Sequence, residues 1–225
     1  MEKCIVNGIE SKDSVYRDVN YWNQYYDNHP VPIGNGESQF ARDMMPYMES
    51  KKNLIELGCG NGRDSLFFAS KGIHVTGIDI SKNAINMLNK VNTYEGTRFL
   101  CEDFSGESDI FCVQYDYCYS RFTLHAINEI QEQNTLRNAW NALKKEGLFF
   151  IEARSINDDI YGKGKCIGKH SYIYNDHFRR FIDKEELVEK LINLGFKIIY
   201  EEENTGFALY KDQNPRLVRV VAKKI

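Results

Sequence analysis

The stretch Asn53-Leu-Ile-Glu-Leu-Gly-Cys-Gly-Asn-Gly-Arg-Asp64 combines a short apolar run, three alternating glycines and the start of a helical pattern. This order predicts a strand over 53–58, a tight turn and a helix over 64–71. Many α/β proteins hold nucleotide-like ligands at such a strand, turn and helix. The glycine turn is therefore the expected ligand site.

Strands and helices are expected to alternate along the rest of the chain. Apolar runs and 3.6-residue periodicity predict an α/β fold with a doubly wound, mostly parallel seven-stranded sheet. The last two strands are expected to pair as a C-terminal antiparallel hairpin, and Pro46 is expected to kink or split its helix. The further strands are expected over 73–79, 98–101, 116–120, 148–152, 196–200 and 217–222, and the further helices over 38–50, 84–91, 130–144 and 184–194.

The composition indicates one globular domain over 1–225. The net charge of −3 and the pI near 6.0 disfavour a surface that grips nucleic acid. The sequence has neither an N-terminal apolar signal region nor a run of about 18 apolar residues, so we expect no membrane partner and a cytoplasmic location. The six cysteines contain no C-x-x-C pair, which favours free thiols over a metal site or disulfides.

Two segments fall outside the periodic pattern. Residues 1–36 are polar and irregular but carry four aromatic side chains within 21–26, and we expect them to cover the ligand as a lid. Residues 155–181 are expected to form an insertion loop on the acceptor side. Within 161–180, five Lys and Arg residues against one Asp give a charge of 5 − 1 = +4. This charge suggests an acceptor with phosphate or carboxylate, although a solvated loop would have the same composition.

The glycine spacing excludes two common phosphate-binding motifs. The Gly-x-Gly-x-Gly run over 58–62 lacks the G-x-G-x-x-G spacing of dinucleotide-binding turns, and no Gly-Lys-Ser/Thr of a P-loop follows it. Asp79 ends the next expected strand, where it can accept hydrogen bonds from two ribose hydroxyls. Asp103 and Phe104 follow the third strand and are placed to contact an adenine amino group and ring.

Three stretches, Glu56-Leu-Gly-Cys-Gly-Asn-Gly62, Gly77-Ile-Asp79 and Glu102-Asp-Phe104, resemble the cofactor-binding motifs of class I S-adenosylmethionine-dependent methyltransferases. The resemblance covers about residues 38–152 and implies a Rossmann-like methyltransferase fold with S-adenosyl-L-methionine as cofactor. Other stretches, among them Tyr21-Trp22 and 177–181, are similar to small methyltransferases of bacterial capsule and surface-polysaccharide clusters, some of them linked to O-methyl phosphoramidate. The cofactor-binding residues are then expected to be Trp22, Tyr26, Ser38, Gly58, Cys59, Gly60, Asn61, Asp64, Asp79, Ile80, Ser81, Asp103, Phe104 and Ser120.

The segment after the fourth strand indicates which class of acceptor is methylated. Enzymes that methylate amino groups of nucleic acids carry Asn/Asp/Ser-Pro-Pro-aromatic here, whereas this chain has Ser120-Arg-Phe-Thr-Leu-His125, which disfavours a nucleic-acid partner. If the segment is helical, Arg121 and His125 share one face and are the expected catalytic residues. His125 would act as a base or a positioning group, or make only a structural hydrogen bond, and Arg121 could instead contact the cofactor carboxylate. The expected substrate-binding residues are Arg154, His170, Tyr174, His177, Arg179 and Arg180.

Three functions fit these residues. The first is methyl transfer to an oxygen of a small anionic acceptor, containing sugar or phosphate, in capsule or surface-glycan biosynthesis. The second is methylation of another small acceptor, namely a carboxylate, an amine or a metalloid oxyanion. The third is a cofactor-binding accessory protein without turnover. A dehydrogenase is disfavoured by the glycine spacing.

Overall fold

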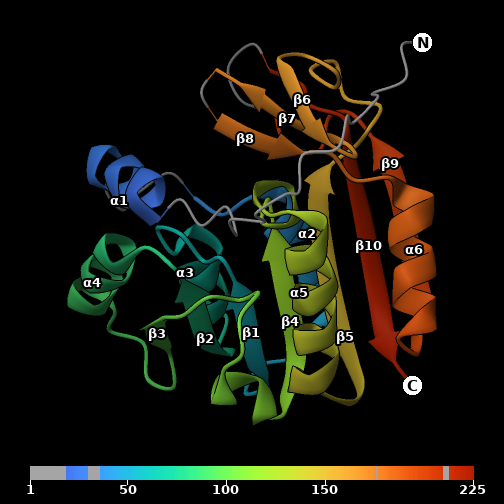
Figure 1. The fold of residues 1–225 in the computed structure, drawn as a ribbon. Helices are drawn as coiled ribbons and strands as arrows, with labels where there is room; N and C mark the ends of the chain where they lie inside the picture. The colour runs from blue at the N-terminus through green and yellow to red at the C-terminus, as the bar shows by residue number, and fades with distance from the viewer. Residues whose placement is uncertain (1–18, 30–35, 176, 210–212) are drawn as a thin grey trace.

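A computed structural model describes residues 19–29, 36–175, 177–209 and 213–225 of the chain. Its main sheet has seven strands in the order β3-β2-β1-β4-β5-β10-β9 (Figure 1). The first five run parallel, and β10 is antiparallel to both of its neighbours, which confirms the expected sheet and its antiparallel C-terminal pair. The strands are β1 (Asn53–Leu57), β2 (His74–Asp79), β3 (Arg98–Cys101), β4 (Tyr115–Arg121), β5 (Leu143–Arg154), β9 (Phe196–Asn204) and β10 (Leu217–Lys224).

Apolar side chains of the central strands alternate between two cores. On β5, Phe149 and Ile151 belong to the core that includes residues of α5 and α6, whereas Phe150 belongs to the core that includes residues of α2 and α3. Because a strand directs successive side chains to opposite faces, both faces of the sheet are buried. The helices are α1 (Val19–Asn28), α2 (Gln39–Met44), α3 (Arg63–Ser70), α4 (Lys82–Val91), α5 (Glu129–Ala142) and α6 (Lys184–Asn193), with 3-10 turns η1 (Met45–Tyr47), η2 (Asp109–Cys112) and η3 (Leu124–Ala126).

The strand order reverses between β1 and β4. The chain proceeds outward from β1 to β2 and β3, then returns to place β4 on the other side of β1. Open α/β sheets bind ligands outside the carboxyl ends of their strands at such a reversal. Helix α1 and a small antiparallel sheet lie at this end of the main sheet (Figure 1). The small sheet comprises β6 (Lys165–Gly168), β7 (Ser171–Tyr174) and β8 (His177–Arg180).

The structure corrects one expected segment and refines two others. Residues 155–181 were expected to form a loop but contain the three-stranded sheet β6–β8, whose four-residue strands are too short to show periodicity in the sequence. Pro46 ends α2 at Met44 and lies in η1, as expected of a residue that cannot continue a helix. Of the lid expected over 1–36, residues 19–28 form α1, whereas 1–18 and 30–35 lie outside the described residues.

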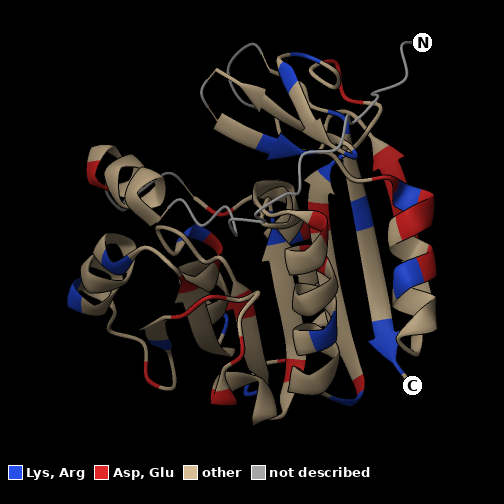
Figure 2. Ribbon diagram, viewed as in Figure 1, with Lys and Arg blue, Asp and Glu red and all other residues tan. Residues whose placement is uncertain are grey.

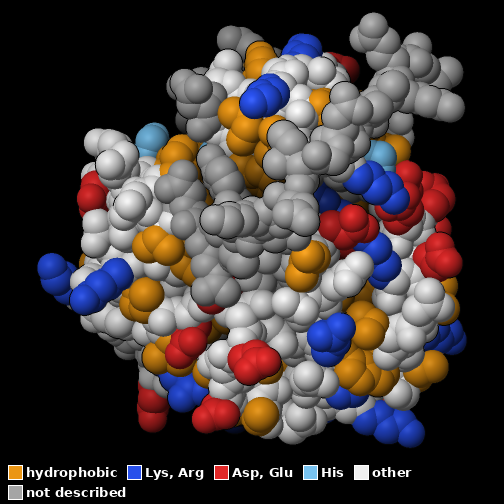
Figure 3. Space-filling view, viewed as in Figure 1, with side chains coloured by type: hydrophobic (Ala, Val, Ile, Leu, Met, Phe, Trp, Pro, Cys, Tyr) orange, Lys and Arg blue, Asp and Glu red, His pale blue; other side chains and the backbone are white. Residues whose placement is uncertain are grey.

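Charged residues of both signs are interspersed on the outer elements, for example along α6 (Figure 2). On the face shown in Figure 3, hydrophobic side chains form small groups between charged ones. Within the described part of the chain, no helix has both the length and the apolar character needed to cross a membrane.

Candidate active site

A cleft of about 470 Å³ opens at the carboxyl ends of β1 to β5. Its floor is the glycine turn after β1, where Gly58 and Gly60 have φ angles of 69° and 54°. A side chain at Gly58 would collide with Thr123, and one at Gly60 would collide with the Tyr26 hydroxyl. Only glycine combines this left-handed backbone with such close neighbours. Glycine is therefore required at these two positions by the protein's own side chains.

Four carboxylates line one half of the cleft: those of Glu56, Asp64, Asp79 and Asp103. They come from β1, the first turn of α3, the end of β2 and the residues after β3. Asp79 accepts hydrogen bonds from the backbone N–H of Gly60 at 2.9 Å and of Ser81 at 2.8 Å. Burial raises the pKa of Asp79 despite these two bonds, which lower it. Asp79 thus fixes the glycine turn and also lines the cleft.

Asp64 is held in place by three hydrogen bonds. The backbone N–H and hydroxyl of Ser38 donate to it at 2.8 and 2.7 Å, and the Tyr119 hydroxyl donates at 2.8 Å. Glu56 lies nearby and accepts a hydrogen bond from Ser65. Burial, and next the Asp64 carboxylate, raises the pKa of Glu56 well above its ordinary value. The pKa values of Glu56 and Asp79 are thus raised, and a cationic ligand in this half would stabilise the ionised form of both groups.

Helix α1 brings its aromatic residues to the cleft. Asn23 and Asp27 hydrogen-bond to the N-terminal end of α4, through Ser81 and Asn83. Tyr21, Trp22, Tyr25 and Tyr26 line the cleft. On the opposite side, the Tyr21 ring stacks on His177 of β8 with centroids 4.5 Å apart. Helix α1 thus spans the cleft from α4 to the small sheet.

Arg121 and His125 do not share one helix, so the condition for a common helical face is not met. Arg121 ends β4, Phe122 has a left-handed backbone with φ 57°, and His125 lies in η3. The Arg121 guanidinium pairs with Glu152 of β5 at 2.9 Å and lies 4.4 Å from the centre of the Phe122 ring. Its charge is therefore already compensated at the floor of the cleft.

His125 lines the cleft and has an unusual environment. Its Nδ1 is buried and has no hydrogen-bond partner among the described residues. Burial, followed by the charges of Arg154, Arg179, His177 and Arg121, lowers the pKa of His125 well below its ordinary value. The imidazole is therefore neutral at physiological pH.

The half of the cleft opposite the carboxylates is cationic. Arg154, at the end of β5, pairs with Asp158 at 2.9 Å. Arg179 of β8 forms no salt bridge within the described ranges, and its buried Nε has no hydrogen-bond partner there. Burial, and next the Arg154 guanidinium, lowers the pKa of Arg179. Of these two arginines, Arg154 therefore has a salt-bridge partner among the described residues and Arg179 does not.

Several predicted residues lie outside the cleft. Arg180, predicted to bind the acceptor, is instead buried and paired with Glu132 of α5, which also pairs with Lys190 at 2.7 Å. Tyr174 also does not line the cleft. Among the predicted cofactor residues, five do not line the cleft: Ser38, Cys59, Gly60, Ser81 and Ser120. Four of these hydrogen-bond a lining residue: Ser38 bonds Asp64, Gly60 and Ser81 bond Asp79, and Ser120 bonds Thr123. Trp22, Tyr26, Gly58, Asn61, Asp64, Asp79, Ile80, Asp103 and Phe104 do line it, as do Arg121, His125, Arg154, His177 and Arg179.

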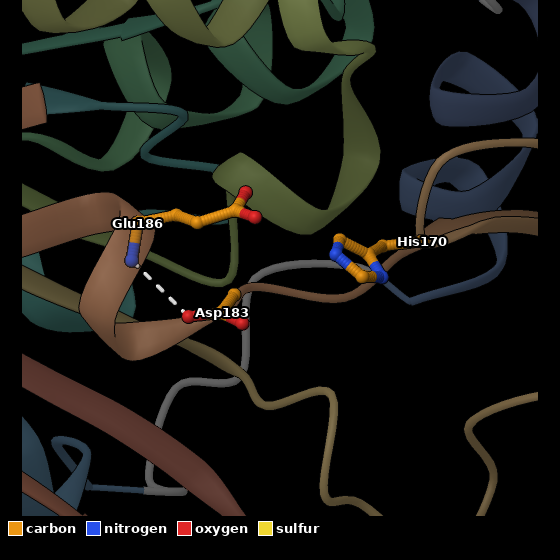
Figure 4. Close-up of side chains that lie close together, drawn as sticks. All are labelled: His170, Asp183 and Glu186. Carbon is orange, nitrogen blue, oxygen red and sulfur yellow. Dashed lines mark hydrogen bonds between the residues drawn. The ribbon is translucent and has the colours of Figure 1, made fainter.

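His170, predicted to bind the acceptor, is grouped with Asp183 and Glu186 (Figure 4). One donor atom from each of the three lies within 4.8 Å of the others. Each side chain has a structural partner, however. His170 Nδ1 bonds the Tyr161 hydroxyl at 2.9 Å, Asp183 caps α6 by accepting from the Glu186 N–H, and Glu186 pairs with Lys169 at 2.7 Å. These contacts stabilise the junction between the small sheet and α6.

Sequence reasoning missed several cleft residues. Phe122 and Thr123 lie between Arg121 and His125, which the sequence predicts as site residues. Their position between two predicted residues could have indicated that they line the cleft. Gln131 belongs to the capping box that starts α5 at Asn128, which predicts a helix end and not a site. Tyr21 and Tyr25 belong to the expected aromatic lid, and the missed lining residues are Glu56, Arg63, Phe122, Thr123, Ala126, Ile127, Gln131 and Phe178.

The carboxylate half fits a nucleoside cofactor with a net positive charge. Asp79, Asp103 and Phe104, which the sequence predicts to contact ribose hydroxyls and a base, line this half, and its carboxylates would repel the two phosphates of a dinucleotide. S-adenosylmethionine, with a sulfonium and an ammonium against one carboxylate, meets these requirements and supplies an electrophilic methyl group when bound.

The fold and the glycine turn are similar to those of class I methyltransferases. Comparison with known proteins agrees, because residues 55–149 match the family model described as "Methyltransferase domain". A putative methyltransferase of Bacillus subtilis, YqeM, is 30% identical over 124 residues, which are 52% of this chain and 48% of that protein. The chain thus aligns with about half the length of this relative.

Two solved structures share the fold. A SAM-dependent methyltransferase from Methanosarcina mazei superposes with a TM-score of 0.70 at 20% identity, over 81% of this chain and 97% of that one. The glycopeptide N-methyltransferase MtfA, solved with S-adenosylmethionine, gives 0.64 at 15% identity, over 85% and 96%. These likenesses show that the chain shares the fold of these two proteins.

Removing residues 1–30 should weaken SAM binding while leaving the sheet folded. Trp22 and Tyr26 are the cleft-lining aromatics expected to contact the cofactor, and aromatic contacts contribute about 0.5–1.5 kcal/mol each beyond the area that they bury. We therefore expect calorimetry to show a loss of roughly 5- to 150-fold in SAM affinity. The far-UV circular dichroism spectrum should change only by the contribution of the deleted helix α1. Normal SAM affinity in the truncated protein would mean that these rings only pack.

Proposed function

We propose that this protein transfers a methyl group from S-adenosylmethionine to an oxygen of a small anionic acceptor. The observation that carries the proposal is the separation of charge in the cleft. Glu56, Asp64, Asp79 and Asp103 line the cofactor half together with Arg63, which donates to the backbone carbonyls of Gly36 and Glu37, whereas Arg154, Arg179 and His177 line the other half. A cationic cofactor and an anionic acceptor would each be attracted to its own half.

The half of the cleft that contains Arg154, Arg179 and His177, here called the acceptor half, would distinguish the candidate substrates by their charge. An ammonium acceptor would lie beside the Arg179 guanidinium, which already lacks a counterion. A phosphate or carboxylate would instead give Arg179 the partner that it lacks, in the two-pronged geometry that a guanidinium favours. Sugar phosphates and related precursors fit this requirement. A role in capsule or surface-glycan biosynthesis in the cytoplasm is part of the proposal, and rests on the sequence resemblance alone.

Calorimetry with the purified protein tests the cofactor. SAM and its demethylated product are expected to bind with micromolar affinity, whereas NADH is expected to bind far more weakly, because its two phosphates face the four carboxylates. Tighter binding of NADH than of SAM would refute the proposed function. Genes for glycan synthesis beside this gene would support the finer role, and their absence would weaken it.

Replacing Arg179 with glutamine should raise the KM for the acceptor and leave SAM affinity unchanged. Hydrogen bonds to charged groups contribute about 1.5–3 kcal/mol, so we expect an increase of roughly 10- to 150-fold. The assay measures transfer of labelled methyl to sugar phosphates, each paired with its dephosphorylated sugar. The matched control is Lys163→Gln, which removes an exposed charge from the same insertion away from the cleft. Preference for the neutral sugars would contradict the anionic acceptor.

A further inference from the structure

Three metal-ligating side chains from two segments meet at the junction between the small sheet and α6. His170 lies in the turn between β6 and β7, Asp183 is the N-cap of α6, and Glu186 lies in its first turn. The imidazole points toward both carboxylates (Figure 4), and one donor atom of each residue lies within 4.8 Å of the others. None of the three lines the cleft, so this group is separate from the candidate active site.

Each of the three side chains uses one atom for a structural contact and keeps another. His170 bonds the Tyr161 hydroxyl through Nδ1, which leaves Nε2. Asp183 caps α6 with one oxygen, and Glu186 pairs with Lys169 through one oxygen, so each carboxylate keeps a second oxygen. Among the described residues, the imidazole forms neither a hydrogen bond nor a salt bridge with either carboxylate. The three groups thus lie around a common space without bonding one another.

The histidine distinguishes this group from the ordinary start of a helix. Carboxylates are common in a first helical turn, because they interact favourably with the helix dipole. His170 comes from another segment, and burial lowers its pKa, so the ring is neutral near pH 7. If Nε2 carried the ring proton, a hydrogen bond to one of the facing carboxylates would be expected. With the proton on Nδ1 and donated to the Tyr161 hydroxyl, Nε2 instead offers a lone pair beside two carboxylates.

We propose that His170, Asp183 and Glu186 bind a divalent transition-metal ion of the zinc class, through Nε2 and one oxygen of each carboxylate. Zn²⁺ accepts imidazole nitrogen and carboxylate oxygen together, with water as a fourth ligand. Tetrahedral zinc ligands lie about 3.4 Å apart at bond lengths of about 2.1 Å, so small rotations of the two half-buried carboxylates would complete the site. Mg²⁺ is disfavoured, because it requires a near-ideal octahedron of oxygen ligands.

The metal ion would connect the turn between β6 and β7 to the start of α6. The two segments already touch, because the Phe181 N–H donates to the His170 carbonyl at 2.9 Å. Strand β8 lies between these segments in the chain and brings Arg179 to the cleft. Zinc would therefore fix the position of β8 from outside the cleft, without contacting the reacting atoms. The inference does not depend on the proposed function.

Calorimetric titration of the full chain with ZnCl₂ tests the site. The parent protein should show a binding event that His170→Gln lacks, whereas His74→Gln, at an exposed histidine of β2, should bind as the parent does. Zinc bound by cysteine thiols would be common to all three proteins, so the difference between them identifies the site. Asp183→Asn should also weaken this event, although asparagine still caps α6. Equal zinc binding by the parent and His170→Gln would overturn the inference.

Two variants outside the ligand set test the assignment of the ligands, with opposite expected effects. Tyr161→Phe removes the oxygen that orients the imidazole and should weaken zinc binding about 10- to 100-fold, the usual effect of losing such an outer contact. Lys169→Gln removes the exposed cation that competes for Glu186 and should strengthen zinc binding by up to about fivefold. Unchanged affinity in Tyr161→Phe, or weaker binding in Lys169→Gln, would contradict the assignment.

Thermal unfolding followed by circular dichroism provides a second measurement. A ligand that binds only the folded protein raises its Tm, so ZnCl₂ should raise the Tm of the parent and of His74→Gln. MgCl₂ at the same concentration should raise neither. His170→Gln should fold to the same circular dichroism spectrum as the parent but show no rise with zinc. A rise of the same size in His170→Gln would place the bound zinc elsewhere and overturn the inference.

Discussion

Replacing Glu152 with leucine is expected to lower the free energy of unfolding by about 3–5 kcal/mol, the cost of removing one partner from a buried ion pair. Glu152 is fully buried and pairs with Arg121 at 2.9 Å and with Arg219 of β10 at 2.7 Å. Arg219 continues the network to Asp43 at 2.8 Å. Without Glu152, one buried guanidinium would lose its compensating charge and another would retain only Asp43. Urea unfolding followed by circular dichroism measures the change.

Two further variants make this prediction specific. Glu189→Leu changes an exposed glutamate of α6 in the same way and should alter stability by about 0.5 kcal/mol or less. Adding Arg219→Met to Glu152→Leu should recover part of the loss, because the double variant no longer leaves Arg219 unpaired. A single variant that stays within about 1 kcal/mol of the parent would mean that water or local rearrangement compensates both arginines.

Replacing Asp79 with alanine is expected to weaken SAM binding by about 1–3 kcal/mol, which is roughly 5- to 150-fold. The loss has two sources in the structure. Ribose hydroxyls would lose their acceptor, and the N–H of Gly60 and of Ser81 would lose the carboxylate that fixes the glycine turn and the start of α4. Calorimetry with SAM measures the effect, and Asp109→Ala, at an exposed aspartate outside the cleft, is the control.

The pH dependence of SAM binding provides an independent check on Asp79. Burial raises the pKa of this carboxyl group, so it takes up a proton at a higher pH than an exposed aspartate does. SAM affinity should therefore be full at neutral pH and fall as the pH drops through the raised pKa. Asp79→Ala should lack that decline. An Asp79→Ala protein with unchanged affinity would show that the ribose is held elsewhere.

Local chemistry made the cofactor half of the site predictable from sequence. Gly58 and Gly60 are needed wherever a left-handed turn meets close neighbours, and that requirement is visible in the residue type itself. Asp79 and Asp103 follow apolar strands, and the carboxyl ends of parallel strands meet at one edge of the sheet. Short-range patterns therefore placed these four residues together without any knowledge of long-range contacts.

In the acceptor half of the cleft, the residues available to a ligand depend on which charged side chains form ion pairs. The sequence did not determine those pairs. Arg179 and Arg180 are neighbours in the chain, yet Arg180 is paired with Glu132, 48 residues away, while Arg179 faces the cleft. Because successive residues of a strand point to opposite sides, β8 directs one arginine into the core and the other into the site. Arg121 is likewise compensated by Glu152, 31 residues away. The sequence by itself determined the glycine turn, the acidic residues at the strand ends and the excess of positive charge within 161–180. Only the tertiary packing of β8, β5 and η3 decided that Arg179 and His125 are left for a ligand.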